Sequence, residues 1–138
     1  MTTEEWLLAA FSTAAENELT PVQVQKMLFL IEKAFGNTGY DFQPYDYGPF
    51  DAAVYEDLRK LAAKELVKPV PTGRGWVKHA LTPAGLARGK EIAGRLSKSQ
   101  QDYIAEVSSF VRSLSFSDLV KAIYKAYPEM RTNSVFRD

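Results

Sequence analysis

One stretch with the pattern of a β-hairpin interrupts a chain that otherwise reads as a series of helices. In residues 67–81, "VKPVPTGRGWVKHAL", both ends are rich in β-formers, and Thr72-Gly73-Arg74-Gly75 has the composition of a turn. We therefore predict that Val67–Val70 pairs with Trp76–Leu81. Three predicted helices precede this hairpin, and a fourth comes directly after it. That order is typical of a winged helix, in which the hairpin is the wing.

The first two helices have clear start signals. Thr2 with Glu5, and Thr20 with Gln23, have the spacing of capping boxes, in which each side chain accepts from the other residue's backbone N–H. The first box opens a helix that we expect to run through Ala14. The second opens a helix that is apolar on most sides, so it should run through the centre of the core.

Further caps predict four more helices. The candidate caps are Asp51, Thr82, Ser97 or Ser99, and Ser115 or Ser117. Three glycines weaken the fourth helix by roughly 1 kcal/mol each, and we expect close packing to compensate at Gly85, Gly89 and Gly94. The 138 residues are predicted to form one mostly helical α+β domain. Its winged-helix-like core, three helices plus the hairpin wing, takes residues 1–98, and a C-terminal helical extension takes 99–138.

The composition predicts a cytoplasmic globular protein. Hydrophobic residues make up 46% of the chain and charged residues 25%, close to the globular average. No apolar run approaches the roughly 20 residues that cross a bilayer, and "MTTEEWLLAAF" carries acids where a secretory signal carries Lys or Arg. There is no cysteine, which excludes disulfides, thiol nucleophiles and zinc–thiolate sites. We therefore expect no membrane association.

Catalytic signals are weak, and we predict that the protein is not an enzyme. His79 is the only histidine, and no neighbour in sequence is placed to orient it as a general base. The acids at 41, 46, 51, 56 and 57 lack the alternating ligands and sharp glycine turn of a calcium loop. The glycines match no phosphate-binding motif. We expect no metal and no cofactor.

Charge is segregated along the chain although the net charge is zero. Residues 1–57 hold ten acids and two bases, a net charge of −8, whereas residues 59–98 hold ten bases and two acids, a net charge of +8. Such segregation indicates either two faces that bind different partners or two segments that neutralise each other inside the fold. Both interpretations stay open from the sequence.

Five aromatic residues gather in residues 40–50, "YDFQPYDYGPF". Alternation predicts an extended segment that crosses the helices and turns into the third helix at Gly48-Pro49. In an antiparallel arrangement this segment could pair with the wing as a third strand. We expect it to be structural first and a binding surface second. The expected core residues are Phe42, Tyr47 and Phe50, and the expected partly exposed ones are Tyr40 and Tyr45.

Three motifs together resemble one known family. They are "LTPVQVQKMLFLIEKAF", "YDYGPFDAAVYEDLRKL" and "LVKAIYKAYPEMRTNSVF", which span residues 19–136 in order. They are similar to the Panacea, or SocA-like, antitoxin domain family and its uncharacterised relatives. The resemblance implies a non-enzymatic protein from bacteria or their phages that neutralises or delivers a partner protein, often a toxin encoded next to it. It transfers no catalytic residue to this chain.

A second, generic likeness is to the wing region of winged-helix proteins. It rests on "LRKLAAKELV" and "GWVKHALTPAG". Glu65 stands where that pattern usually has glycine, so we expect a differently built or mildly strained turn after the third helix.

The leading functional hypothesis is a protein-binding module, either antitoxin-like or an adaptor. Charge complementarity would set its specificity, and tyrosines are common binding hot spots. The candidate partner-binding residues are Tyr40, Tyr45, Asp46 and Glu56. The oligomeric state stays open, with a homodimer as one option.

The alternative hypothesis is a DNA-binding transcriptional regulator that uses a basic wing. The candidate DNA-binding residues are Lys60, Lys64, Lys68, Arg74, Lys78 and Arg88. Asp51, Glu56 and Asp57 count against it, because acids at the start of the third helix would repel phosphates where a recognition helix meets DNA.

Overall fold

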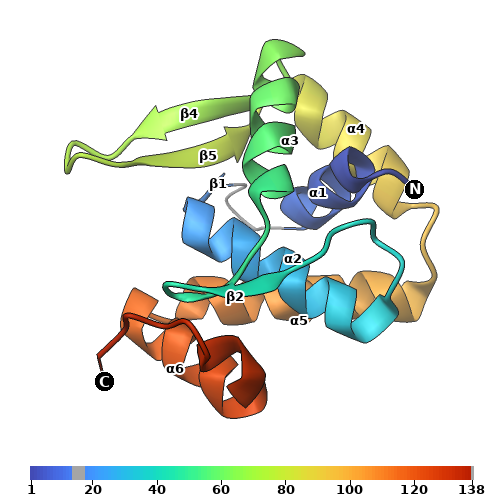
Figure 1. The fold of residues 1–138 in the computed structure, drawn as a ribbon. Helices are drawn as coiled ribbons and strands as arrows, with labels where there is room; N and C mark the ends of the chain where they lie inside the picture. Colours follow the sequence, from blue (N-terminus) through green and yellow to red (C-terminus); the bar gives the residue numbers. More distant parts are fainter. Residues whose placement is uncertain (14–17, 138) are drawn as a thin grey trace.

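The computed structural model describes residues 1–13 and 18–137, and this part of the chain is mostly helical (Figure 1). Its helices are α1 (Thr3–Ser12), α2 (Pro21–Phe35), α3 (Ala52–Ala63), α4 (Pro83–Ala93), α5 (Lys98–Ser113), α6 (Phe116–Ala126) and the short 3-10 helix η1 (Pro128–Arg131). Its strands are β1 (Glu18–Leu19), β2 (Gln43–Tyr45), β3 (Gly48–Phe50), β4 (Val67–Pro71) and β5 (Val77–Leu81). The predicted α+β, mostly α class is confirmed.

The predicted wing is an antiparallel hairpin, β4–β5, that projects from the helices (Figure 1). Its register places Val67 opposite Leu81 and Pro71 opposite Val77. The sheet has a third strand that the sequence did not predict, because β1 is only two residues long. β1 pairs with β5, which gives the strand order β1-β5-β4. The arrangement of α1, α2, α3 and the wing is therefore that of a winged helix.

The predicted caps begin the helices. Both capping boxes, at Thr2 and Thr20, are complete. The caps of the later helices are Asp51, Thr82, Ser97 and Ser115. Ala14, where we expected the first helix to extend, lies outside the described residues.

Close packing explains two of the three glycines in the α4 region. A Cβ on Gly85 would lie 1.9 Å from the carbonyl oxygen of Leu66, and one on Gly89 would lie 2.5 Å from that of Leu8. Any larger residue would push α4 away from its neighbours. Gly94 is different, since it is the C-cap of α4 and its nearest neighbours belong to the same helix. The packing prediction is therefore wrong for Gly94.

Glu65 adopts a left-handed conformation with φ of 59°. In the same turn, the Leu66 N–H donates to the carbonyl of Leu61 at 2.9 Å and closes the end of α3. The expected mild strain is confirmed, because side chains larger than glycine disfavour this region.

The aromatic stretch does not join the wing, so that prediction is wrong. β2 and β3 pair with each other in a separate two-stranded sheet, with Tyr45 opposite Gly48. A two-residue turn, Asp46-Tyr47, sits at the tip and carries Tyr47 outward. Tyr47 is 45% exposed where we expected a core residue, and Tyr40 is 5% exposed where we expected a partly exposed residue. Phe42 is buried and Tyr45 exposed, as predicted, whereas Phe50 is only half-buried.

One hydrophobic core joins the winged helix to the C-terminal helices. α5 packs along α2, and Ile104, Val107 and Val111 of α5 belong to the same buried cluster as Met27 and Leu28 of α2. No helix in residues 1–13 and 18–137 is both long and apolar enough to cross a membrane.

The segment after η1 returns to the β2–β3 hairpin. The Val135 N–H donates to the Asp46 carbonyl at 2.9 Å, and the Asn133 side chain donates to the Pro44 carbonyl at 3.2 Å. The Phe136 ring lies near Phe116 of α6, 6.3 Å between ring centres. The hairpin is thus held between α2 on one side and the end of the described chain on another.

Candidate functional site

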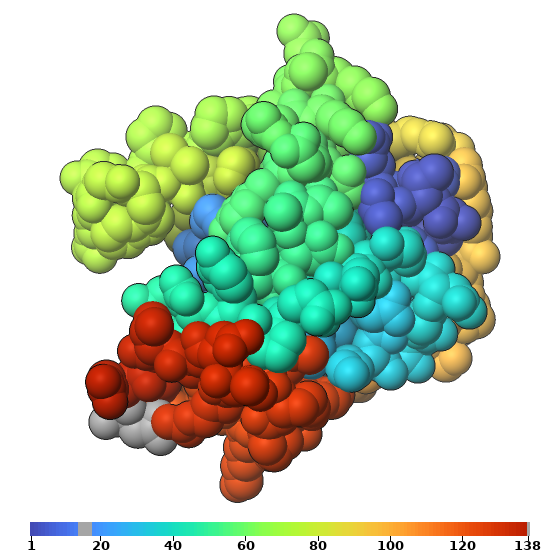
Figure 2. Space-filling model, in the orientation of Figure 1, coloured from blue at the N-terminus to red at the C-terminus, as the bar shows by residue number. Residues whose placement is uncertain are grey.

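A groove runs between the wing and the β2–β3 hairpin. In Figure 2 the surface is hollowed there, with the start of α2 between the two hairpins. We call it the aromatic groove, after the exposed side chains along it: Tyr45, Tyr47, Tyr55, Trp76 and Phe116. These rings are 38–54% exposed. The groove therefore gathers aromatic surface from α3, α6, the wing and the β2–β3 hairpin.

Two adjoining pockets form the floor of the groove. The Trp76 pocket, about 400 Å³, is lined by Thr20, Pro21, Val22, Gln23, Trp76, Leu114, Phe116 and Leu119. The Lys26 pocket, about 200 Å³, is lined by Val22, Gln25, Lys26, residues 45–50 and Tyr55. Val22 belongs to both, and the Tyr47 ring contacts the Phe116 ring edge to face, 5.2 Å between centres. The two pockets therefore adjoin and form one mostly apolar surface.

Lys26 is the exceptional residue of this site, because its side chain is only 3% exposed. Its ammonium nitrogen would lie 3.6 Å from a Cβ placed on Gly48. In the described part of the chain no side chain or carbonyl bonds to this ammonium group. Burial lowers its pKa from 10.5 to about 8, so the group remains mostly protonated at neutral pH.

The neighbouring Gln25 is, by contrast, a buried polar side chain whose amide nitrogen and oxygen both have hydrogen-bond partners. It is 2% exposed, and its amide nitrogen donates to the Asp51 carbonyl at 2.9 Å. Its carbonyl oxygen accepts from the Asp51 N–H at 3.1 Å. This pair of bonds fixes the junction of β3 and α3. Buried polar groups normally have such partners, which makes the unpartnered Lys26 ammonium unusual.

The structure places only two of the four candidate partner-binding residues at the groove. Tyr45 and Asp46 line the Lys26 pocket. Glu56 lies on the exposed side of α3, in an ion pair with Arg59. Tyr40 is buried beneath the surface.

The buried Tyr40 hydroxyl donates to the Asp57 carboxylate at 2.7 Å. Burial and this neighbouring carboxylate raise the pKa of Tyr40 far above its usual value. Asp57 is 4% exposed. Two residues that the sequence placed on the surface therefore form an internal structural contact.

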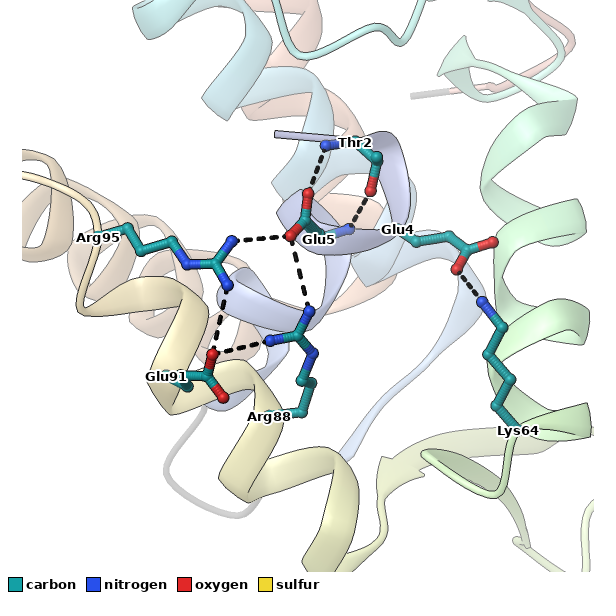
Figure 3. A network of polar contacts seen from close by, with 7 residues as sticks. All are labelled: Thr2, Glu4, Glu5, Lys64, Arg88, Glu91 and Arg95. Carbon is teal, nitrogen blue, oxygen red and sulfur yellow. Dashed lines mark hydrogen bonds and ion pairs between the residues drawn. The ribbon is translucent and has the colours of Figure 1, made fainter.

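The basic segment neutralises part of the acidic one inside the fold (Figure 3). Arg95 donates to Glu5 at 2.9 Å, and Lys64 donates to Glu4 at 2.7 Å. Arg88 lies 3.8 Å from Glu5 and also pairs with Glu91, 3.0 Å away. The Thr2 backbone N–H and Arg95 lower the pKa of Glu5 by bonding to its carboxylate. Internal neutralisation, one of the two interpretations of the charge pattern, thus holds for these residues.

This network involves two of the six candidate DNA-binding residues, Lys64 and Arg88. Lys68, Arg74 and Lys78 instead belong to the wing, where Arg74 is exposed in the turn. Lys60 is exposed on α3.

The histidine lies in the sheet of the wing. His79 is half-buried in β5, between Leu19 and Pro69 of the flanking strands, and burial lowers its pKa. Within residues 1–13 and 18–137, no three His, Asp or Glu side chains gather closely enough to hold a metal ion.

Sequence reasoning missed Lys26, Trp76 and Phe116 as members of the site. Trp76 had a usable signal, because an apolar side chain beside the glycine turn of a wing is a candidate for exposure. Lys26 had a weaker one, since a lysine in an otherwise apolar stretch of helix must either reach solvent or be buried at a cost.

The chain matches no model of a known protein family, and no curated protein sequence matches it. The resemblance to the Panacea family therefore stays a prediction.

Proposed function

We propose that this protein is a non-catalytic, cytoplasmic protein-binding module, antitoxin-like or an adaptor, that holds a protein partner in the aromatic groove. The observation that carries the proposal is the set of five exposed aromatic side chains around two joined pockets. The family resemblance supports the same class, with a bacterial or phage origin and a toxin as the natural kind of partner.

Aromatic side chains exposed to water are energetically unfavourable, so a cluster of them on the surface indicates a binding role. Contiguous apolar patches on soluble domains commonly mark binding sites, and tyrosine and tryptophan dominate binding energy at protein interfaces. Trp76 and Phe116, which both line the Trp76 pocket, are suited to contact an apolar side chain of the partner. Because Glu4 and Glu5 are already paired, the acidic α1 is a weaker candidate for the contact surface.

The test is an affinity purification of the tagged protein from its own cells, with and without nuclease, read by mass spectrometry. We expect one stoichiometric protein that survives nuclease, and we expect Trp76→Ala to lose it. Phe110→Ala is the matched control, because Phe110 is also an exposed aromatic residue, 42%, but lies on α5 outside both pockets. Equal loss in both variants, or no protein in the wild type, would overturn the proposal.

DNA binding remains a second candidate because of the wing. Arg74 and Lys78 line a polar recess beside Trp76, on the hairpin that extends away from the helices (Figure 1). Replacing both with Glu should abolish DNA binding if the wing contacts phosphates. Unchanged affinity for DNA in that variant would exclude this use of the wing.

A further inference from the structure

We propose that the Lys26 pocket binds a carboxylate, the side chain of an aspartate or glutamate that the partner inserts between Tyr45, Tyr47 and Tyr55. The inference rests on the proposed function for the identity of the partner. It adds the chemistry of one contact, which neither the sequence motifs nor the charge segregation indicated.

In the free protein, the ammonium group of Lys26 is buried without a partner among the described residues. Lys26 is 97% buried, yet the residues around it provide no bonding partner in the described chain. Gln25, one residue earlier in the same helix, has its polar atoms matched by the Asp51 backbone. An unpaired buried charge is destabilising, and natural proteins retain such groups mainly where they act.

Lys26 lines a pocket that opens to the surface. Lys26 forms the base, next to Gly48 and Pro49, and the rings of Tyr45, Tyr47 and Tyr55 stand around the opening. Gly48 has φ of 105° and no side chain, so the hairpin backbone lies against the ammonium nitrogen with no side chain between them. A ligand group that enters past the tyrosines meets Lys26 directly.

The chemistry of Lys26 favours a negatively charged ligand group. A protonated amine with apolar walls gains most from a full negative charge, because the surroundings screen the attraction poorly. A carboxylate offers that charge and two acceptor oxygens. The volume of about 200 Å³ suits a side chain rather than a folded segment.

Asp46 also lines this pocket and must be included in the charge balance. Its side chain is exposed at the tip of the hairpin, and it forms no ion pair with Lys26. A second carboxylate entering the pocket is opposed by Asp46 and attracted by Lys26. We therefore expect Asp46→Asn to strengthen carboxylate binding.

The experiment uses phenylacetate as the probe and phenylacetamide as its neutral isostere. Binding to the full-length wild-type protein is followed by NMR through the Gly48 amide and the Lys26 side-chain signals. We expect phenylacetate to bind at least tenfold more tightly than phenylacetamide and to raise the pKa of Lys26. Lys26→Met should abolish that preference while the protein remains folded.

Equal affinity for the two probes would overturn the inference, and this comparison needs no variant to fold. A preference for phenylacetate that survives in Lys26→Met would overturn it as well. The affinity purification is separate. If phenylacetate is selected through Lys26 but no protein co-purifies, the proposed function fails while the carboxylate pocket stands. If a partner binds wild type and Lys26→Met equally, the carboxylate contact fails while the proposed function stands.

Discussion

Replacing Lys26 with Met should stabilise the protein, and the gain should depend on pH. The pKa of this lysine falls from 10.5 in an exposed chain to about 8 in the fold, because burial penalises the charged form. That difference corresponds to about 3 kcal/mol of folding free energy. Below pH 8 the group is protonated in both states and the full cost is present; above 10.5 it is neutral in both and the cost vanishes.

Between those values the unfolded chain binds the extra proton, so the contribution of Lys26 to stability improves as pH rises. Methionine has a similar length and no charge to bury, so Lys26→Met removes the cost at every pH. The variant should exceed wild type by about 3 kcal/mol at pH 7, and this advantage should shrink by about the same amount between pH 8 and 10.5.

The assay is urea unfolding of both proteins at half-unit pH intervals, with the free energy of unfolding extrapolated to water. Taking the difference between the two proteins cancels every other group that titrates over this range. A difference that is flat with pH, or a variant that is less stable at pH 7, would show that the ammonium group is solvated or bonded. Either result would refute the reasoning.

Three further substitutions separate surface from structure. Tyr45→Ala should weaken partner binding but cost at most about 1 kcal/mol of stability, since the ring is exposed; pull-down and urea unfolding measure both. Tyr40→Phe should cost about 2 kcal/mol, because it leaves the buried Asp57 carboxylate without its hydroxyl donor; urea unfolding at pH 7 measures it. Gly85→Ala should cost about 3 kcal/mol or more, because the methyl group would overlap the Leu66 carbonyl; thermal unfolding measures it.

Each of these substitutions has a matched control in the same assay. Phe42→Ala, in the buried part of the aromatic stretch, should cost about 3–5 kcal/mol, and an equal loss for Tyr45→Ala would make that ring structural. Tyr103→Phe loses only a long 3.5 Å bond and should change stability little. If Tyr103→Phe and Tyr40→Phe lower the free energy of unfolding equally, the result would contradict the stabilising role of the buried Tyr40–Asp57 bond. Gly94→Ala, at the end of α4, should change stability little. If Gly85→Ala also changes stability little, the close approach of α4 to the Leu66 carbonyl is wrong.

The helices were predictable because their signals are local. The capping boxes at Thr2 and Thr20 fix start points through bonds that span three residues, and the fold contains both. The hairpin wing was predictable for the same reason, since turn and strands lie within fifteen residues. Its third strand was not, because the pairing of Leu19 with His79 joins residues far apart in the sequence.

The candidate site was only partly predictable, because it forms from separate segments. Alternation in residues 40–50 implies one continuous strand, but Asp46-Tyr47 breaks it into a hairpin, which turns Tyr47 outward. Tyr40 is buried where its hydroxyl donates to Asp57, a contact between residues 17 positions apart. The second reason concerns charge. In the sequence Glu5 resembles a surface acid, but Arg95, which follows the end of α4, lies 2.9 Å from it. Charges that are separated along the chain therefore neutralise each other in the fold.

The contact between residues 133–136 and the β2–β3 hairpin has a consequence for how the tyrosines are presented. Strands of three residues are too short to persist alone in water, so the bonds from Asn133 and Val135 help to keep this hairpin in one shape. A partner then meets rings whose conformational entropy is already lost, and it binds more tightly for that reason. Clipping the last few residues would weaken binding although none of them lines either pocket.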